Sequence, residues 1–219
     1  EMCIRDSENS ELILESSDGT WWGAADWSKD DQRVLIQNYI SVSNSKVYIV
    51  DLKTKKKILV LGEKERSSVN SALAFDRKDE GIFFITDKYG SFNQLAYHDL
   101  ETQEVAVISS EIPWDVDGFA ISEDGNRAAF VVNENGYGSL YLLNPESLKF
   151  RKVKALPIGT ISGLQFSKDN KNLGLTLNTF QSPSDTYLLK LNRSPIGHGK
   201  LIRWTFSEVG GLDLSLIHI

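Results

Sequence analysis

The chain has 219 residues, a net charge of −6 and a single cysteine, and no apolar run approaches the ~20 residues that a membrane-spanning helix needs. Its mild acidity argues against a nucleic-acid surface, which requires a clustered basic field. One cysteine excludes a disulfide scaffold and a zinc cluster built on thiolates, and the length suits one large all-β domain.

Both ends of the chain have the sequence of translated DNA adapter. Residues 2–7 (MCIRDS) back-translate to ATG TGT ATA AGA GAC AG, and residues 214–219 (LSLIHI) to CTG TCT CTT ATA CAC ATC. These are the two strands of one DNA sequence, which matches the end of a transposase-type sequencing adapter. We therefore expect 1–7 and 214–219 to be artefacts and exclude them from fold reasoning. The single Cys and Met fall in the excluded part, and 8–213 is expected to be an internal fragment.

In chain order, the first element is an alternation of charged and apolar residues at 11–15 (ELILE). It predicts the outer β-strand of a unit whose earlier part is missing. Asp18 and Gly19 then turn the chain, and four similar units follow. Each unit has four short apolar runs separated by turns rich in Asp, Asn and Gly, which predicts hairpins because Asn and Gly accept the positive φ of tight turns.

The four units are predicted at residues 23–61, 70–109, 116–154 and 161–204. An apolar residue, here called the anchor, precedes the first turn of each unit, at Trp27, Phe75, Ile121 and Phe166. A tyrosine recurs in each third run, at Tyr48, Tyr97, Tyr141 and Tyr187. The anchors are 48, 46 and 45 residues apart, and each tyrosine follows its anchor by 20 to 22 residues.

A period near 45 with four strands per unit is typical of propeller blades. The sequence therefore predicts an all-β fold, a partial β-propeller of about four four-stranded antiparallel blades in an open arc. Because blades pack face to face, we expect the anchors and the four tyrosines to fill the space between them. Trp21 and Trp22, in a Gly-flanked loop outside the register, are also interpreted as packing residues, with ligand stacking as the alternative.

The search for chemical groups finds no catalytic, cofactor-binding or metal-binding residue. The nucleophile elbow Gly-x-Ser-x-Gly is absent, since residues 159–163 (GTISG) place the serine one position too late. His98, in a strand beside Asp99, and His198, in a Gly-Lys loop, have no metal-ligand spacing, and each is interpreted as partly solvated.

Two charged features are interpreted as turns. The basic run at 53–57 (KTKKK) predicts a solvated hairpin turn rather than a binding patch. The acidic turns, which contain Asp30, Asp79, Asp124 and Asp169, lack the ligand spacing and closing Glu of an EF-hand. They are therefore interpreted as turn chemistry rather than calcium loops.

The blades resemble repeats shared by periplasmic TolB-like translocation proteins and serine peptidases of the prolyl oligopeptidase family, whose turn typically reads Ser-Pro-Asp-Gly-Lys. The corresponding turns here are 122–126 (SEDGN) and 167–171 (SKDNK). Residues 175–187 and 203–212 (RWTFSEVGGL) resemble the last blade and exit segment of the acylaminoacyl-peptidase and dipeptidyl-aminopeptidase branch. Phe206 departs from this pattern, because a polar residue such as Glu is expected there.

The resemblance implies a parent peptidase in which a Ser activated by His and Asp attacks a peptide carbonyl. The propeller would hold no catalytic group. It would cap the active site and restrict entry to short peptides, while residues 205–213 lead toward a missing C-terminal α/β-hydrolase domain. No cofactor or nucleic-acid partner is expected, and both periplasm and cytoplasm fit as compartments.

The alternative function is a stand-alone propeller, TolB-like or WD-repeat-like, that acts as a protein-interaction module. Sequence after residue 213 discriminates the two hypotheses. A Gly-x-Ser-x-Gly within an α/β pattern there would establish the peptidase, whereas a stop codon or a further blade would exclude it.

The open arc leads to a prediction about the isolated chain. Propellers close with about four to eight blades, and these peptidases use the upper end, so a four-bladed arc exposes two outer faces and their strand edges. We predict that the chain, expressed alone, is poorly soluble or self-associates. A monodisperse monomer in light scattering, with a cooperative melt, would contradict this prediction.

Overall fold

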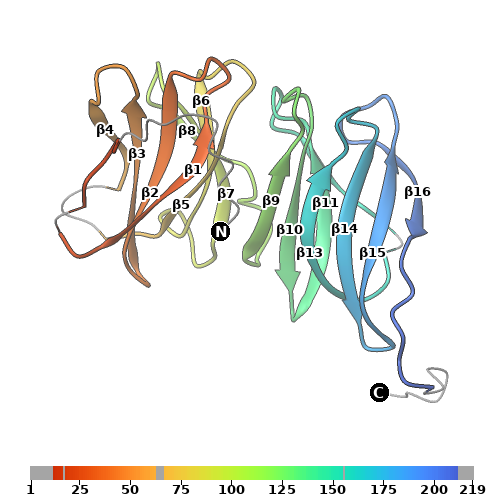
Figure 1. The fold of residues 1–219 in the computed structure, drawn as a ribbon. Helices are drawn as coiled ribbons and strands as arrows, with labels where there is room; N and C mark the ends of the chain where they lie inside the picture. The colour runs from red at the N-terminus through yellow and green to blue at the C-terminus, as the bar shows by residue number, and fades with distance from the viewer. Residues whose placement is uncertain (1–11, 17, 63–66, 155, 212–219) are drawn as a thin grey trace.

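The computed structural model describes residues 12–16, 18–62, 67–154 and 156–211. They form sixteen β-strands in four four-stranded antiparallel sheets, and none of them lies in a helix able to cross a membrane. Each sheet is one blade, and the blades stand side by side in an open arc (Figure 1). This arrangement confirms the predicted all-β partial propeller. The expected adapter residues, 1–7 and 214–219, lie outside the described part.

All four blades follow one plan, in which each strand pairs with the next along the chain. Blades 1 and 2 contain β1 (Trp21–Trp27), β2 (Arg33–Ser41), β3 (Asn44–Asp51), β4 (Lys57–Leu61), β5 (Asn70–Phe75), β6 (Gly81–Thr86), β7 (Gln94–Asp99) and β8 (Val105–Val107). Blades 3 and 4 contain β9 (Val116–Ile121), β10 (Ala128–Glu134), β11 (Tyr137–Leu143), β12 (Phe150–Lys152), β13 (Gly159–Phe166), β14 (Asn172–Thr179), β15 (Ser182–Leu191) and β16 (His198–Arg203). The first and fourth strands of every blade are therefore sheet edges.

This strand order gives the propeller two different ends, because neighbouring strands run in opposite directions. The turn end, uppermost in Figure 1, carries the connections between first and second and between third and fourth strands, at residues 28–32, 52–56, 76–80, 100–104, 122–127, 144–149, 167–171 and 192–197. The exit end carries the remaining connections and the chain after β16, at residues 42–43, 62, 67–69, 87–93, 108–115, 135–136, 153–154, 156–158, 180–181 and 204–211.

The core lies between the blades, as β10 illustrates. Ala128, Phe130 and Val132 belong to a cluster with residues of blade 2, whereas Ala129 and Val131 belong to a cluster with residues of blade 4. The alternation follows from the two-residue period of a strand, and it explains why the run is apolar throughout. Full burial of one such side chain as large as Phe contributes about 1.5–3 kcal/mol.

Three of the four tyrosines pack between blades as the sequence predicts, whereas Tyr48 lies on the outer face of blade 1. Tyr97 and Tyr141 lie in the cluster between blades 2 and 3, and Tyr187 lies between blades 3 and 4. The Tyr141 ring stacks on Phe130, with ring centroids 4.9 Å apart. Tyr48 is partly buried against Trp22, with centroids 5.1 Å apart.

The expectation for Trp27 is wrong, although the other three anchors pack between blades. Phe75, Ile121 and Phe166 each contact the preceding blade. Trp27 is 53% exposed, because no described blade precedes β1. All four anchors thus occupy the same position in their blades, but an anchor is buried only where a preceding blade covers it.

Two expectations near the start of the chain are also corrected. Trp21 and Trp22 do not lie in a loop but begin β1, where they pair with Tyr39 and Asn38. The described part of 11–15 is not a strand, since residues 12–16 pair with no sheet. Ile13 and Leu14 instead pack on the outer face of blade 1, in the cluster that contains Val34, Ile36 and Val50.

The first turn of each blade shows why Ser and Asp recur there. In blade 1 the Ser28 hydroxyl donates to Asp30 at 2.6 Å and accepts the backbone N–H of Arg33 at 2.8 Å. The same two bonds form at Ser122 and Ser167. The bond from Ser28 lowers the pKa of Asp30 below its usual value. The fourth residue of each turn has a positive φ, at Asp31, Asp79, Gly125 and Asn170. The acidic turns are thus held by their own hydrogen bonds.

Blade 2 has Asp76 in place of the turn serine. Its carboxylate accepts the backbone N–H groups of Lys78 and Glu80 at 2.9 and 3.0 Å. It also accepts the Tyr97 hydroxyl at 2.6 Å. Gly81 makes room for this contact, because a Cβ there would lie 2.1 Å from Tyr97 Oη. Burial, followed by the Asp76 hydrogen bond, raises the pKa of Tyr97, so the hydroxyl keeps its proton and donates.

The close approach of Tyr97 predicts the effect of Gly81→Ala. The new methyl group must displace the ring, so we expect the free energy of unfolding to fall by about 1–3 kcal/mol, measured by urea denaturation. In a Tyr97→Leu background the same change should cost less, because the clashing ring atoms are gone. Gly174→Ala is the matched control, since its Cβ would make only ordinary contact at 3.5 Å. An equal cost at both glycines would contradict the explanation.

Candidate functional site

The turn end is held together by polar contacts between blades near the centre of the arc. The backbone N–H of Lys29 donates to both carboxylate oxygens of Asp79, at 2.9 and 2.8 Å, and the Lys29 ammonium donates to the Glu123 carbonyl at 3.3 Å. Arg77 donates to Asn126 at 2.9 Å. The first turns of blades 1, 2 and 3 are therefore linked directly.

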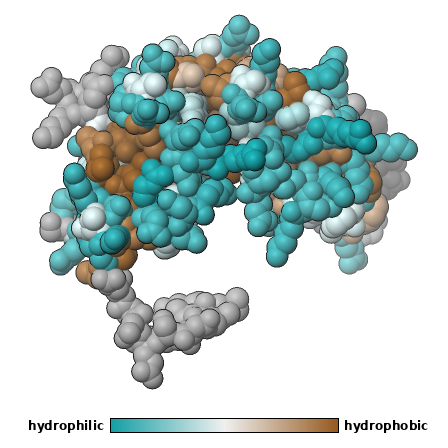
Figure 2. Space-filling model, turned by 90° about the horizontal axis from the view of Figure 1, so that it is seen from above, coloured by the Kyte–Doolittle hydropathy of each residue, from teal (hydrophilic) through white to brown (hydrophobic). Residues whose placement is uncertain are grey.

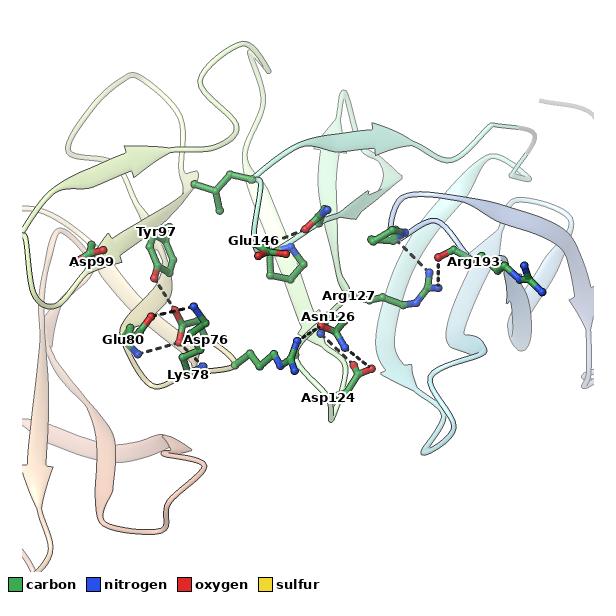
Figure 3. A pocket seen from close by; sticks show the side chains of 16 residues that line it. Asp76, Lys78, Glu80, Tyr97, Asp99, Asp124, Asn126, Arg127, Glu146 and Arg193 are labelled. Atoms are coloured by element: carbon green, nitrogen blue, oxygen red, sulfur yellow. Dashed lines mark hydrogen bonds and ion pairs between the residues drawn. The ribbon is translucent and has the colours of Figure 1, made fainter.

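Arg127 makes the corresponding link to blade 4. Its guanidinium donates to the carbonyl oxygens of Asn192 and Ser194, the latter at 2.8 Å, in the loop between β15 and β16. A cavity of about 610 Å³ lies beside these contacts (Figure 3). Its charged lining residues are Asp76, Glu80, Asp99, Asp124, Glu146, Arg77, Lys78, Arg127 and Arg193. The lining contains both acidic and basic residues, and two of the basic ones, Arg77 and Arg127, already donate hydrogen bonds to a neighbouring blade.

The described residues include no cluster of metal-ligating side chains. No three His, Cys, Asp or Glu side chains among them lie close enough to hold a metal ion. His198 is partly exposed, as expected, but it begins β16 rather than lying in a loop, and its Nδ1 lies 3.0 Å from the Gly199 carbonyl oxygen. His98 was expected to be partly solvated but is buried, because β7 lies between β6 and β8 and pairs it with Ile82. Burial lowers the pKa of His98, which favours the neutral ring.

The basic run at 53–57 forms the connection between β3 and β4 and the first residue of β4, as predicted. Lys57 extends its ammonium over two aromatic rings, 4.3 Å from the centroid of Trp22 and 4.9 Å from that of Tyr48. Such cation–π contacts stabilise a partly exposed lysine by about 0.5–1 kcal/mol.

Exposed apolar side chains gather at the exit end. Those at or beside its connections are Trp21, Tyr39, Ile40, Val42, Tyr89, Trp114, Tyr137, Ile158, Phe180, Trp204 and Phe206. At the turn end, the corresponding exposed large apolar residues among those described are fewer, namely Trp27, Ile58 and Leu59. Figure 2 looks down on the turn end and shows hydrophilic residues over most of it. The exit end thus offers apolar side chains to a partner, whereas the turn end offers mainly hydrophilic ones.

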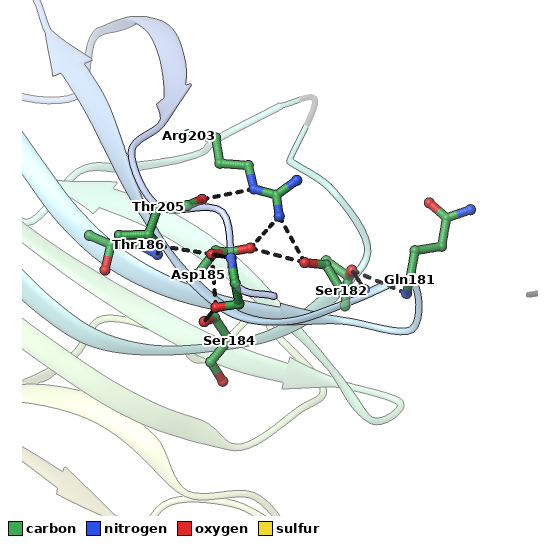
Figure 4. A network of polar contacts seen from close by, with 9 residues as sticks. Gln181, Ser182, Ser184, Asp185, Thr186, Arg203 and Thr205 are labelled. Carbon is green, nitrogen blue, oxygen red and sulfur yellow. Dashed lines mark hydrogen bonds and ion pairs between the residues drawn. The ribbon is translucent and has the colours of Figure 1, made fainter. Parts of the chain in front are cut away.

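The segment that leaves blade 4 is fixed at the exit end by one buried carboxylate. Asp185, at the start of β15, is 1% exposed. It accepts hydrogen bonds from the Thr205 hydroxyl at 2.8 Å, from the Ser207 backbone N–H at 2.9 Å and from Ser182 at 2.9 Å, and it forms an ion pair with Arg203 (Figure 4). Residues 205–207 are therefore bound back onto the blade.

This network also decides the charge state of Asp185. Desolvation by itself raises the pKa of a buried carboxylate, but the bonds from Thr205, Ser207, Ser182 and Arg203 outweigh it and lower the pKa of Asp185 well below its usual value. The carboxylate is therefore ionised at neutral pH. Arg203 also lies over the exposed ring of Phe206, 4.7 Å from its centroid. Phe206, which stands where the family pattern has a polar residue, therefore still contacts Arg203.

Sequence reasoning missed Asp185 as a key residue. Its position, two residues before the repeated tyrosine, is occupied by Lys46, Leu95 and Ser139 in the other blades. An acidic residue found at that position only in blade 4 could have marked Asp185 as a residue with a special role. Its partners, however, come from β16 and the segment after it, which spacing along the chain does not indicate.

Comparison with known proteins resolves the fold family. The model of the prolyl oligopeptidase N-terminal β-propeller domain matches residues 4–195, which is most of the chain. The chain belongs to this propeller family. The resemblance read from the turns is therefore confirmed at the level of the propeller domain, and the exit segment lies outside the matched residues.

Solved structures with the same fold include prolyl peptidases and a TolB protein. A prolyl endopeptidase matches 89% of this chain with a TM-score of 0.72 and 15% identity. Prolyl oligopeptidase B from Galerina marginata matches 93% with a TM-score of 0.74 and 12% identity. TolB from Acinetobacter baumannii matches 94% with a TM-score of 0.65 and 16% identity. No curated protein sequence matches the chain.

The chain spans only part of each of these proteins. It covers 27% of the prolyl endopeptidase, 29% of prolyl oligopeptidase B and 48% of TolB. At these identities the likeness establishes the propeller fold, and the activity of a whole protein does not follow from it.

The Asp185 network predicts a pH-dependent loss of stability. We expect Asp185→Asn to lower the free energy of unfolding at pH 7 by about 3 kcal/mol, because the partly exposed Arg203 and several donors lose their charged acceptor. The folded-state pKa lies below the usual ~3.9, so this contribution is complete above that value and is lost as pH falls below it. Urea denaturation of both proteins should therefore converge in strongly acidic buffer.

A local measurement separates this effect from general destabilisation. Chymotrypsin should cleave after Trp204 or Phe206 much faster in Asp185→Asn than in the unchanged chain, since the segment is no longer bound to Asp185. Asp117→Asn, an exposed change in β9, serves as control and should alter stability by less than about 0.5 kcal/mol. Equal cleavage rates in all three proteins would show that Asp185 does not hold the segment.

Proposed function

We propose that the chain is the non-catalytic propeller portion of a serine peptidase, which caps the active site and restricts access to short peptides. The observation that carries the proposal is the gathering of exposed apolar side chains at the exit end, where the chain also leaves blade 4. Contiguous exposed apolar surface on a soluble protein marks an interaction site. Membership of the prolyl oligopeptidase propeller family supports a hydrolase domain as the partner.

The exit segment supports this orientation. Asp185 holds Thr205 and Ser207 against the exit end, so a domain that follows them begins beside Trp204 and Phe206. These two rings are exposed and would contact it. The charged turn end faces away from such a domain and would remain in solvent.

As a cap, the propeller would select peptide substrates by their size. A serine nucleophile, its histidine and the oxyanion donors would lie in the hydrolase domain, covered by the exit end. Peptides would then reach them only through the arc or between the domains. Covering the site would also exclude water and strengthen the electrostatic contacts within it.

A second function has a specific observation in its favour. The fold matches TolB from Acinetobacter baumannii over 94% of this chain, which supports a stand-alone propeller that acts as a protein-interaction module. The apolar exit end would then bind a separate protein. The two proposals differ in whether a hydrolase domain belongs to the same chain.

Recovery of the full gene, followed by assay of its product, tests the proposal. We expect the full-length protein to hydrolyse aminoacyl or dipeptidyl reporter substrates and to lose this activity with a serine-directed inhibitor. Short peptides should be cleaved faster than folded proteins that contain the same bond. Absence of a Gly-x-Ser-x-Gly hydrolase domain from the gene product would reject the peptidase and favour the interaction module.

The capping role has its own test in the full-length protein. Trp204→Asp should weaken contact between the domains and raise the cleavage of long substrates relative to short ones. Ile58→Asp is the control, because Ile58 is similarly exposed but lies on β4, away from the exit end. The same substrate ratio in both variants would argue against a cap.

A further inference from the structure

A second hollow, at the exit end, differs in chemistry from the charged cavity at the turn end. It is a groove of about 390 Å³ between blades 1 and 2, and β1, β5 and the hairpin of β2 and β3 contribute its walls. Its exposed apolar residues are Trp21, Tyr39 and Val42. Among the residues that the structure describes, no Asp, Glu, Lys, Arg or His lines it. A volume of this size is within the range of small-ligand sites, about 300–1,000 Å³.

Two polar side chains of the groove are already engaged between the blades. Gln37 donates to the Asn70 carbonyl at 2.9 Å and accepts the backbone N–H of Ala72 at 2.7 Å. Ser45 donates to the same Asn70 carbonyl at 2.9 Å. These bonds join blades 1 and 2. The hydroxyl groups of Tyr39, Ser41 and Ser71 also belong to the lining, so the groove combines apolar surface with a few uncharged polar groups.

The groove is open because of small residues on the two inner strands. Ala24 and Ala25 of β1 and Ala72 of β5 contribute to its lining, and each strand has an irregular register there, between Ala24 and Asp26 and between Ala72 and Ala74. β1 and β5 are also edge strands of their sheets. Short side chains beside an unpaired strand edge let an extended peptide approach closely.

Trp21 is an exposed aromatic residue that packs on the backbone of its own strand. Its ring lies over Gly23, where a Cβ would come within 2.3 Å of the Trp21 Cη2 atom. The ring nevertheless remains 59% exposed, and Val42, at the tip of the hairpin, is 85% exposed. An exposed aromatic ring and an exposed aliphatic residue thus flank a hollow whose described lining carries no charge, which is the arrangement that suits an apolar side chain.

We propose that this groove binds an uncharged, apolar side chain of the peptide substrate. The inference rests on the proposed function, because the groove opens at the exit end, continuous with the surface through which the propeller would meet the hydrolase domain. In the described part of its lining Tyr39 is the ionisable residue, and such a lining disfavours charged side chains, whose desolvation it does not compensate. The groove therefore sets a preference for apolar residues in the peptide.

The direct test uses the chain itself, labelled with 5-fluorotryptophan. The probes are two blocked tetrapeptides, acetyl-Ala-Ala-Phe-Ala-amide and acetyl-Ala-Ala-Asp-Ala-amide, and the fluorine resonance of Trp21 is assigned with Trp21→Phe. We expect the Phe peptide to shift this resonance saturably and the Asp peptide to leave it unchanged. No response to the Phe peptide, or equal responses to both, overturns the inference.

Two hairpin variants provide the matched comparison. Val42→Asp should weaken binding of the Phe peptide at least tenfold, because it places a charge on the wall of the groove. Phe180 occupies the corresponding hairpin position in blade 4, where Thr179 pairs with Ser182 as Ser41 pairs with Asn44. Phe180→Asp should leave binding unchanged, and an equal loss in both variants overturns the inference.

The outcomes also separate this inference from the proposed function, since peptide binding here needs no catalytic group. A response of Trp21 in a protein whose full-length form hydrolyses nothing supports the groove while rejecting the peptidase. Hydrolysis by the full-length protein without a response of Trp21 rejects the groove alone. A shift of the Trp21 resonance with protein concentration, in the absence of peptide, shows that a second copy covers the groove and also rejects it.

Discussion

Face-to-face packing of the sheets is the constraint on which the rest of this structure depends. A middle strand such as β10 is apolar on both faces, with Phe130 directed to one neighbouring blade and Val131 to the other. Such a sheet cannot bury its side chains alone and is stable only between two others. The near-identical turns follow from this, because each Ser-x-Asp turn reverses the chain in the few residues available between closely packed strands.

The difference between the two ends has the same origin. Alternate strands run in opposite directions, so short tight turns collect at one end while hairpin tips and blade links collect at the other. At the turn end, polar groups from different blades meet near the centre and satisfy one another, as Lys29 and Asp79 do. At the exit end, aromatic residues such as Trp114 and Phe180 remain exposed. The proposed capping function would depend on this asymmetry, because only one end of a propeller could meet a catalytic domain.

Much of the fold was predictable, and the failures have physical explanations. Anchor and tyrosine spacing predicted four blades, because the repeat length reflects four strands and their turns. The same counting could not reveal that Trp27 is exposed, since its burial needs a neighbouring sheet. Nor could it place His98 in the interior, because the alternation of β7 is obscured when both faces of a strand are buried. The family resemblance was carried by short turn and exit motifs, and the match over residues 4–195, which contains the turns, confirmed the propeller family.

By itself the sequence determined the blade repeat, the turn chemistry and the family, because these depend on contacts between residues close together in the chain. The tertiary structure decided which residues matter at the ends. Asp185 acquires its role only when β16 and the following segment bring Arg203, Thr205 and Ser207 to it. The groove at Trp21 exists only where β1 meets β5 of the next blade. Both arise from contacts between segments well separated in the chain, which local pattern does not encode.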